Sequence, residues 1–491
     1  MPPAAPMLTM ATTINALMQE ALGEGEGGAG RQSGVHVAGW VKSVRRQKHI
    51  AFVMIDDGTW SKPLQVVVKG EAAADLPDNL QVGDAVRASG DLVGSKGGGQ
   101  AFELVAKSLA PLPGSPTADS GHGKSYPLQK KAHSQGFLRS LPHLRARTSH
   151  FAATMRVRSR LARALQVSAE DHLGCIRVQT PVITAGDCEG AGERFAVAPE
   201  GTAPGDAAAF FGAPTFLSVS GQLEAEALGS GLGNVYTFGP TFRAENSNTS
   251  RHLAEFWMLE PELYFIDSLD TLLHAATTLV TAAVGEVLDD ARAAADLSLL
   301  DPDFELRLSR LVTPGAPWAA IEYTDAIAEL RAAVEAGAAK FAQEPVWGMD
   351  LSTEHEQFVV ARLNPGRPTF IVNYPASIKP FYMKANPRKP GISADGDTVA
   401  AFDLLLPDVG EVMGGSMRED NAELLERAMV AKSMDPALYE WYLDLRRFGS
   451  APHGGFGLGF DRLLQYVTRT PSIRDVVAFP RGPAYFASHP V

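Results

Sequence analysis

Five short segments near the N-terminus alternate apolar and polar residues with a period of two, which is the pattern of half-buried β-strands. They run over residues 34–45, 50–58, 64–68, 85–93 and 101–105, with turn-forming residues between them. Five such strands suit a small oligonucleotide-binding (OB-fold) β-barrel. Barrels of this kind bind unpaired bases on an exposed sheet face, by stacking and by contacts to base edges. The pattern therefore predicts a nucleic-acid-binding module.

Two further apolar strands, at 236–244 and 254–259, flank a short run of small polar residues that favours a turn. This hairpin carries Arg243, Glu245, Arg251, His252 and Phe256. A guanidinium suits phosphate oxygens, a carboxylate can accept from an exocyclic amine, and an aromatic ring offers a stacking face. Together these features describe an ATP site. An Arg-x-Glu pair taken alone is more often a salt bridge on an exposed hairpin.

Glycines at 455, 457 and 459 come just before Asp461 and Arg462, at the predicted start of a helix. No strand, turn and helix with a ribose-binding acid follow them, so the glycines are not a dinucleotide fingerprint. Alternating glycines suit a strand on which a flat ligand lies against the backbone. Arg462 would then reach a phosphate from the first turn of the helix.

Between these segments, residues 267–341 are rich in alanine and show apolar residues at helical spacing, which predicts helices packed outside a sheet. A chain of 491 residues with 45% apolar content predicts at least two domains. No apolar run reaches the length of a membrane span, and the first residues lack the features of a secretory signal. The two cysteines, Cys175 and Cys188, fit neither a zinc pattern nor a disulfide framework. We therefore expect a cytoplasmic protein without membrane contact.

The hairpin residues resemble motif 2 of the class II aminoacyl-tRNA synthetases, and residues 455–462 resemble motif 3. Residues 172–183 resemble motif 1, which supplies the helix, strand and proline of the class II dimer interface. All three motifs occur in order, which is a far stronger signal than any one of them. The chain resembles the subclass of aspartyl, asparaginyl and lysyl enzymes, and the asparaginyl enzymes in particular.

The resemblance implies an α+β fold, in which an antiparallel sheet flanked by helices forms the catalytic domain behind an N-terminal OB-fold barrel. We expect a flexible extension at 1–33 that includes a candidate short helix over 12–22, the anticodon-binding barrel at 34–112, a hinge at 113–134 and the catalytic domain at 135–491. A homodimer is implied by motif 1. The net charge is −12, yet residues 121–160 are basic. This run is either a solvated helical face or part of the tRNA-binding hinge region.

The implied reaction is ATP-dependent ligation of L-asparagine to tRNA(Asn) through an asparaginyl-adenylate. An aspartyl enzyme, discriminating or non-discriminating, is an alternative within the family. A tRNA-independent paralogue that forms amides is a second alternative, although the complete barrel disfavours it. An RNA-binding scaffold without catalysis is a third.

For the amino-acid pocket, the resemblance implies Glu189, Ser220, Gln222 and Glu260 around the substrate ammonium, which needs three acceptors. Arg418 would hold the side-chain oxygen of the substrate. Aspartyl enzymes carry a lysine where this chain has Ala225, with Glu224 and Glu226 beside it. A pocket without that cation no longer favours a charged aspartate over a neutral amide. Glu226 is accordingly included among the asparagine-binding residues.

The resemblance also assigns roles in adenylate formation, where the amino-acid carboxylate attacks the α-phosphorus of ATP and cations offset the growing charge. Arg243 would hold the α-phosphate, and Arg251, His252 and Arg462 the outer phosphates. Glu245 and Phe256 would bind the adenine, with Gly459 and Glu411 completing the ATP site. Asp403 and Glu411 are the candidate ligands for Mg²⁺, which prefers oxygen donors. Their spacing around Pro407 suggests two adjacent strands joined by a turn.

In the barrel, the resemblance implies that Arg45, Phe52 and Gln65 read the anticodon, with Phe52 stacking on a base. Strand alternation alone instead favours Phe52 as a core aromatic residue.

Overall fold

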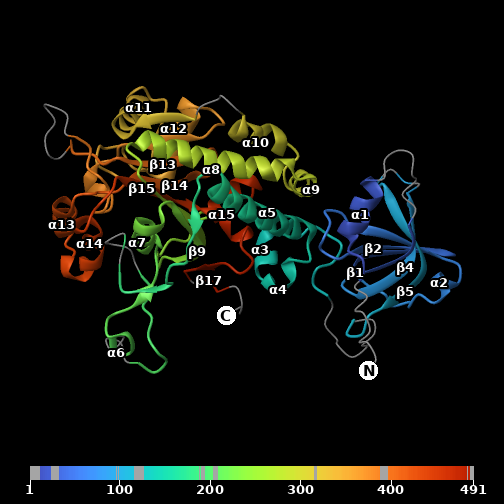
Figure 1. The fold of residues 1–491 in the computed structure, drawn as a ribbon. Coiled ribbons are helices and arrows are strands. Elements are labelled where there is room, and N and C mark those ends of the chain that lie inside the picture. Colours follow the sequence, from blue (N-terminus) through green and yellow to red (C-terminus); the bar gives the residue numbers. More distant parts are fainter. Residues whose placement is uncertain are drawn as a thin grey trace. The chain divides into compact units, whose positions relative to one another are not determined.

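The computed structural model describes residues 11–23, 32–95, 97, 99–115, 126–186, 188, 194–202, 208–313, 318–387, 396–483 and 485–486. Two compact units divide the chain, Met1–Ala153 and Thr154–Val491. Figure 1 shows the first unit as a small blue barrel and the second as a larger domain of sheet and helices. Each unit has its own apolar core.

The N-terminal unit contains a closed five-stranded barrel in the order β1-β2-β3-β5-β4. The strands are β1 (Gln32–Gln47), β2 (Ile50–Asp56), β3 (Leu64–Lys69), β4 (Ala85–Gly94) and β5 (Phe102–Pro111), and the short helix α2 (Glu71–Ala74) follows β3. Only β3 and β5 pair in parallel. Inward-facing residues such as Val37, Val53 and Val66 are fully buried, so strand alternation forms the core. The predicted OB-fold barrel is confirmed.

Helix α1 (Ile14–Gly23) belongs to the barrel core instead of to a free extension. Its apolar face buries Ile14, Leu17, Met18 and Ala21 among the barrel side chains. The backbone amide of Ile14 also donates to Asp57 Oδ2 at 2.7 Å, which fixes the start of the helix. The short helix expected over 12–22 is therefore present, but it packs into the barrel core instead of lying in a flexible extension, because an amphipathic helix can bury its apolar stripe there.

Three helices follow the barrel: α3 (Gln135–Arg139), α4 (Pro142–Arg145) and α5 (Ser149–Asp171). The arginines of the basic run in α5 are not a solvated face, because each meets an acid within the C-terminal unit. Arg156 pairs with Asp296 at 2.7 Å, and the partners of Arg158 and Arg160 are Asp461 and Asp290. This part of the run holds helices together and is not available to RNA.

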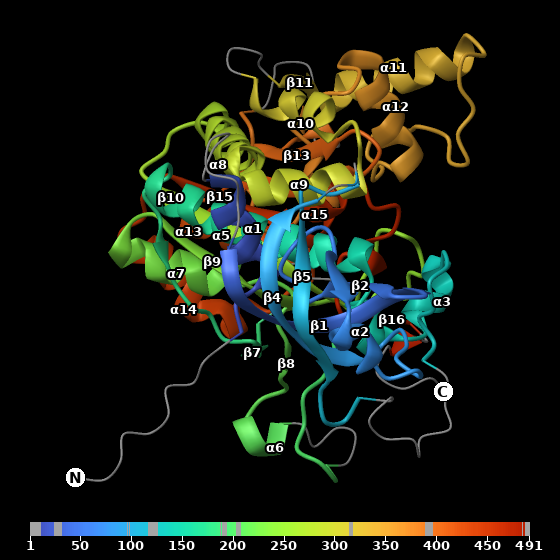
Figure 2. The same cartoon turned by 90° about the vertical axis from the view of Figure 1, so that its right-hand side faces the viewer.

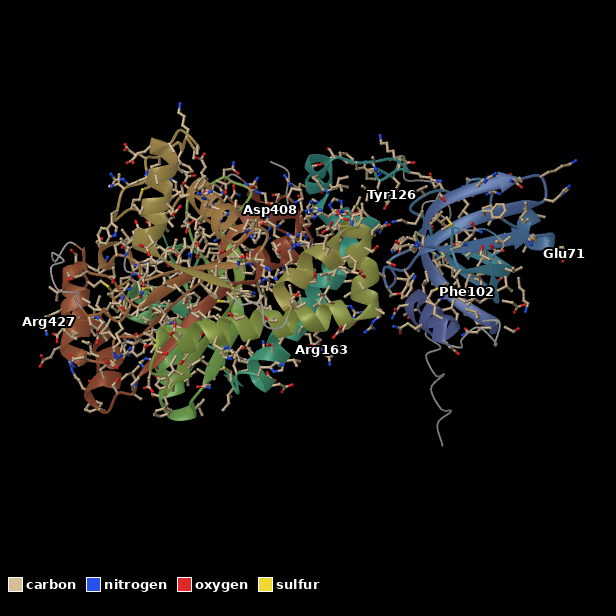
Figure 3. The ribbon with its side chains drawn as sticks, turned by 90° about the horizontal axis from the view of Figure 1, so that it is seen from above. Glu71, Phe102, Tyr126, Arg163, Asp408 and Arg427 are labelled. Atoms are coloured by element: carbon tan, nitrogen blue, oxygen red, sulfur yellow. The ribbon has the colours of Figure 1, made fainter. Side chains whose placement is uncertain are left out.

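The C-terminal unit is built on an eight-stranded sheet in the order β11-β12-β13-β14-β15-β10-β9-β6. The strands are β6 (Ile176–Arg177), β9 (Val235–Phe242), β10 (Glu255–Tyr264), β11 (Ala319–Glu322), β12 (Thr369–Val372), β13 (Ala401–Leu406), β14 (Gly410–Met417) and β15 (His453–Gly459). The central pairs are antiparallel, and the parallel pairs, β11 with β12 and β6 with β9, lie at the two edges. The turn between β13 and β14 contains Asp408, labelled in Figure 3, with φ 66°. The predicted antiparallel sheet is confirmed.

Helices cover this sheet, as predicted for the alanine-rich region. They include α8 (Leu269–Asp289), α9 (Ala291–Leu300), α10 (Phe304–Val312), α11 (Tyr323–Glu335) and α12 (Thr353–Leu363). Figures 1 and 2 both show α11 and α12 beside β13 at one edge of the sheet. By length and composition alone, helix α8 could cross a membrane. Its residues Leu272, Leu279 and Val284 are instead fully buried in the domain core. Its apolar length is explained by packing against β14 and β15.

The remaining described elements of this unit are mostly short. They are β7 (Ile183–Thr184), α6 (Ala208–Phe211), β8 (Phe216–Leu217), α7 (Gln222–Leu232), η1 (Ala376–Ile378), α13 (Ala422–Ala431), η3 (Pro436–Tyr439), α14 (Glu440–Arg447), α15 (Phe460–Val467), η4 (Ile473–Asp475), β16 (Arg481–Gly482) and β17 (Tyr485–Phe486). Helices α13 and α14 pack together over a small core around Tyr442. Helix α15 continues directly from β15, as predicted for the segment after the glycines.

Candidate active site

Strand alternation gives the sheet one apolar and one polar face. Phe402 and Leu404 of β13 and Leu458 of β15 belong to the core that contains α8. Asp403 and the glycines of β15 therefore face the other way. The register aligns Asp403 with Gly414 and Gly414 with Gly457, so two glycines lie side by side in the middle of this polar face. At Gly414 and Gly457 the backbone itself therefore forms the surface of the sheet, and charged side chains border it.

A first cavity lies over β10, β14 and the start of α15. It is lined by all eight residues predicted to bind ATP: Arg243, Glu245, Arg251, His252, Phe256, Glu411, Gly459 and Arg462. Arg243 and Arg462, more than two hundred residues apart in the sequence, thus face the same space. The fold brings the hairpin arginines and the helix arginine together because β10 pairs with both β9 and β15.

Side chains around this cavity hold one another in place. The guanidinium of Arg243 lies 5.4 Å from the ring centroid of Phe256, a cation–π distance. Nη1 of Arg462 donates to the backbone oxygen of Glu411 at 2.9 Å and lies 3.3 Å from Glu411 Oε2. Burial, followed by the nearby charge of Arg462, lowers the pKa of His252, which therefore favours its neutral form. The cavity thus presents three arginines, Arg243, Arg251 and Arg462, among three acids on its lining.

Packing against the neighbouring strand, and not only a flat ligand, helps explain why glycines occupy the motif 3 strand. A Cβ at Gly455 would clash with the Glu262 side chain, and one at Gly457 would clash with the methyl group of Met258. Both side chains come from the neighbouring strand β10. Glycine is required by the packing of β10 at Gly455, where the backbone oxygen of Pro261 is also too close, whereas the flexible Met258 side chain could move away from a Cβ at Gly457. The interpretation as a ligand platform therefore remains a prediction for Gly457, which lines both cavities described here, and for Gly459.

A second cavity adjoins the first and shares Arg243, Met258, Glu411 and Gly457 with it. It contains four of the predicted amino-acid-binding residues, Ser220, Gln222, Glu260 and Arg418, together with Asp403. Glu189 lies outside the described residues. Lys379 and Tyr382 also line this cavity, and sequence reasoning missed both because they lie in an irregular segment with no periodic or motif signal.

The carboxylate of Glu260 is fixed from three sides. It accepts hydrogen bonds from the hydroxyl of Ser220, from the backbone amide of Gly221 at 3.1 Å and from Thr237 Oγ1 at 3.3 Å. These bonds make Glu260 a preformed acceptor for an ammonium group, because its oxygens are already oriented at little further entropic cost.

Beneath the cavity floor lies a fully buried ionic cluster of two acids and two arginines. Glu226 accepts from Arg446 Nη2 at 2.7 Å and from Tyr442, and Arg418 Nε donates to Glu262 at 3.2 Å. Burial would raise the pKa of Glu226, but Arg446 and neighbouring cations bring it well below its ordinary value. Burial raises the pKa of Glu262 to about 7, against the opposing charge of Arg418. With both acids ionised, the four side chains carry no net charge, and His453 Nε2 lies 3.1 Å from Glu226 Oε2 as a further member of the cluster.

Two sequence predictions in this region need correction. Ala225 is fully buried and does not line the cavity, so position 225 is not where a substrate side chain would be met. Glu226 is also fully buried, behind Gln222, whose Nε2 donates to Glu226 Oε1 at 3.0 Å. Any influence of Glu226 on the cavity passes through Gln222 and Arg418. A helix pattern could not reveal which face of α7 meets the cavity.

Asp403 and Glu411 lie on adjacent strands, as their spacing suggested. A Cβ at Gly414 would lie 3.1 Å from Asp403 Oδ1 and 3.6 Å from Glu411 Oε1, so both carboxylates flank this glycine. Burial raises the pKa of Asp403, the ammonium of Lys379 opposes this, and repulsion from Glu411 adds to it. Glu356 stands close by, and burial followed by repulsion from Glu411 raises its pKa to about 7.

On the barrel, Phe52 and Gln65 line a hollow on the outer face of β2 and β3. The expectation from alternation that Phe52 is a core residue is wrong, because its neighbours Ala51 and Val53 are the buried ones. Arg45 is exposed and pairs with Phe52 across β1 and β2, but does not line the hollow. Glu103 was missed: it accepts a hydrogen bond from Gln65 Nε2 at 3.0 Å and lies in the same hollow.

Comparison with known proteins agrees with this architecture. Residues 135–483 match the family of tRNA synthetases class II (D, K and N), and residues 35–112 match the OB-fold nucleic acid binding domain. The chain is 44% identical to the asparagine–tRNA ligase of Thermosynechococcus vestitus, over 91% of this chain and 95% of that protein. It is 43% identical to that of Syntrophobacter fumaroxidans, over 92% and 95%.

Solved structures are similar along nearly the whole chain. The asparaginyl-tRNA synthetase of Pyrococcus horikoshii complexed with asparaginyl-adenylate superposes with a TM-score of 0.80 at 29% identity, covering 98% of this chain and 100% of that one. The Entamoeba histolytica enzyme with asparaginyl-adenylate gives a TM-score of 0.75 at 26% identity, covering 92% and 95%. The barrel, the antiparallel sheet and the paired cavities define a class II aminoacyl-tRNA synthetase. Within that class, the chain belongs to the family of asparagine–tRNA ligases.

Proposed function

We propose that this enzyme activates L-asparagine with ATP and transfers it to tRNA(Asn). The observation that carries the proposal is the shared wall of the two cavities, where Arg243 and Glu411 border both. An ATP in the first cavity and an amino acid in the second would meet at Arg243. The α-phosphate and the substrate carboxylate would thus be neighbours, as in-line attack requires.

Adenylate formation joins two anions, so cations that are already in place supply most of the catalysis. Arg243 would bind the α-phosphate, with Phe256 stacking on the adenine. Arg251, His252 and Arg462 would bind the outer phosphates. The carboxylate oxygen of asparagine forms a bond to the α-phosphorus, and pyrophosphate leaves, so no side chain of the enzyme needs to act as a nucleophile.

Asp403 and Glu411 fit a Mg²⁺ ion that accompanies ATP. Both carboxylates flank Gly414, and Mg²⁺ is bound in such sites by one or two carboxylates together with phosphate oxygens and water. The ion would offset phosphate charge. In the structure, the Lys379 ammonium forms an ion pair with Asp403, with Nζ 2.8 Å from Oδ2.

Selection of asparagine over aspartate would follow from the charge balance beneath the pocket. Arg418 already pairs with Glu262 and lies 3.7 Å from Glu226, so its positive charge is offset. It retains N–H groups that can donate to a carboxamide oxygen. A carboxylate in the same place would find no net positive charge to offset its own desolvation.

Two exposed surfaces support the binding of tRNA and the formation of a dimer. The hollow with Phe52, Gln65 and Glu103 offers a stacking ring and polar groups for anticodon bases. Ile176, Val182 and Ile183 of the motif 1 segment are apolar and 39% to 50% exposed, as expected of a face covered in a two-fold homodimer. Cys175 and Cys188 are both buried, and a chain with only two cysteines fits a reducing cytoplasm.

The direct test is ATP–pyrophosphate exchange with asparagine and aspartate side by side, followed by charging of tRNA(Asn) and tRNA(Asp) transcripts. We expect exchange with asparagine and charging of tRNA(Asn). Equal exchange with aspartate would make the enzyme non-discriminating, and exchange without any tRNA charging would favour a tRNA-independent amide-forming enzyme.

A further inference from the structure

The first turn of α12 contacts an arginine of the ATP cavity. Nη1 of Arg251 donates to the hydroxyl of Thr353, and Nη2 donates to Glu356 Oε2 at 3.2 Å. Thr353 and Glu356 are three residues apart and so lie on one face of the helix. Ser352 caps this turn by accepting from the backbone amide of His355, which fixes where the helix begins. Both contacts to Arg251 therefore come from one rigid element.

The same Glu356 oxygen also accepts from the backbone amide of Glu411 at 3.2 Å. One carboxylate oxygen thus joins the motif 2 arginine to the first residues of β14. Gly410 makes room for this: with φ 78°, it has no side chain where a Cβ would clash with Glu356 Oε2 and lie 2.8 Å from Arg251 Nη2. The ion pair lies directly over the glycine backbone.

Arg251 lines the ATP cavity, whereas Thr353 and Glu356 do not. Of the five N–H groups of the guanidinium, these two bonds use two, one on each terminal nitrogen. The others remain for an anion. An arginine on a polar loop would otherwise lose considerable side-chain entropy on binding phosphate, and an anchor on α12 removes part of that cost in advance.

We propose that Glu356, assisted by Thr353, is a positioning residue that holds Arg251 ready for the outer phosphates of ATP. The inference rests on the ATP site of the proposed function. Glu356 does not touch ATP and acts through Arg251.

The test is the kinetics of ATP–pyrophosphate exchange for Glu356→Gln, which keeps the shape of the side chain and removes its charge. We expect KM for ATP to rise about tenfold, with KM for asparagine within about twofold of wild type. Glu354→Gln is the matched control: Glu354 lies in the same turn and accepts from the backbone amide of Ala342, and it should leave both constants unchanged. Equal rises of KM for ATP in both variants would overturn the proposal.

A double-mutant cycle separates positioning from a purely structural role. If Glu356 acts through Arg251, then Glu356→Gln should add little to the ATP defect of Arg251→Ala. Full additivity would show that Glu356 acts elsewhere. Thr353→Val provides a second variant should Glu356→Gln fail to fold, with an expected rise of about threefold in KM for ATP; an unchanged KM there would contradict the proposal. A wild-type enzyme without asparagine-dependent exchange would instead refute the proposed function.

Discussion

Lys379 and Asp403 form a mostly buried ion pair on the wall of the amino-acid cavity, with Nζ 3.0 Å from Oδ1 and 2.8 Å from Oδ2. The same ammonium lies 3.8 Å from the ring centroid of Tyr374. Glu411, the second carboxylate beside Gly414, borders both cavities. We therefore expect the charges of Lys379, Asp403 and Glu411 to affect the binding of both proposed substrates, ATP and asparagine.

Replacing Lys379 with methionine should lower kcat/KM for asparagine by at least about tenfold, because it removes the ammonium partner of Asp403 from the wall of the second cavity. Pyrophosphate exchange at saturating ATP measures this effect. Lys384→Met is the control, since Lys384 pairs with Asp420 in a more exposed position and does not line the cavity. A similar loss in both variants would argue against a specific role for Lys379.

ATP binding should strengthen as the pH falls from about 8 to 6. The pKa of His252 lies below its ordinary value of 6.5 in the free enzyme, through burial and then the charge of Arg462. Phosphates would favour the protonated ring and raise this pKa, so ATP binding would take up a proton and be tighter at lower pH. The pH dependence of KM for ATP in wild type and His252→Gln measures this, and the two profiles should differ. Parallel profiles would exclude His252 as the source.

The substitution Glu226→Gln should reduce the preference for asparagine over aspartate by about tenfold or more. It leaves the charge of Arg446 unbalanced and gives the pocket above Arg418 a net positive charge, which favours a carboxylate substrate. The ratio of kcat/KM values in pyrophosphate exchange reports the change. Tyr442→Phe removes a hydrogen bond to the same carboxylate without changing charge, and its ratio should stay within about threefold of wild type. Identical ratios in Glu226→Gln and wild type would disprove the charge-balance argument.

For the barrel, Phe52→Ala should lower kcat/KM for tRNA(Asn) charging by about ten- to a hundredfold and leave pyrophosphate exchange intact. The loss corresponds to one base–aromatic stack of about 1–3 kcal/mol. Arg87→Ala, on the exposed side of β4 and outside the hollow, is the control for a general loss of positive charge. If Phe52→Ala charged tRNA normally, the hollow would not be the anticodon site.

Assembly can be tested at motif 1. Ile183→Asp places a charge on a side chain that is 42% exposed, so it should tolerate water in a monomer and oppose burial in a dimer. Light scattering coupled to size-exclusion chromatography should show a dimer for wild type and a shift toward monomer for the variant. A wild-type monomer would contradict the proposed homodimer.

Local patterns accounted for most elements of the fold and for the residues of the ATP cavity. Strands of the barrel, the β9–β10 hairpin and the strand before α15 each follow from short stretches of consecutive residues, where alternation and turn chemistry act. Seven of the eight residues predicted to bind ATP lie on the hairpin and at the start of α15, and Glu411 lies on β14. Lys379, Glu356 and Glu103 had no comparable signal, because their significance depends on partners supplied by other parts of the fold.

The sequence by itself predicted a five-stranded barrel, a hairpin in the second domain, and candidate phosphate-binding arginines on that hairpin and at a helix start, while the antiparallel sheet followed from the family resemblance. The tertiary structure alone decided which charges cancel. Arg446 meets Glu226 from 220 residues away, and Arg251 meets Glu356 from 105 residues away. Backbone hydrogen bonding makes strands and helices local properties, whereas a buried ion pair exists only after folding has removed both groups from water and placed them side by side.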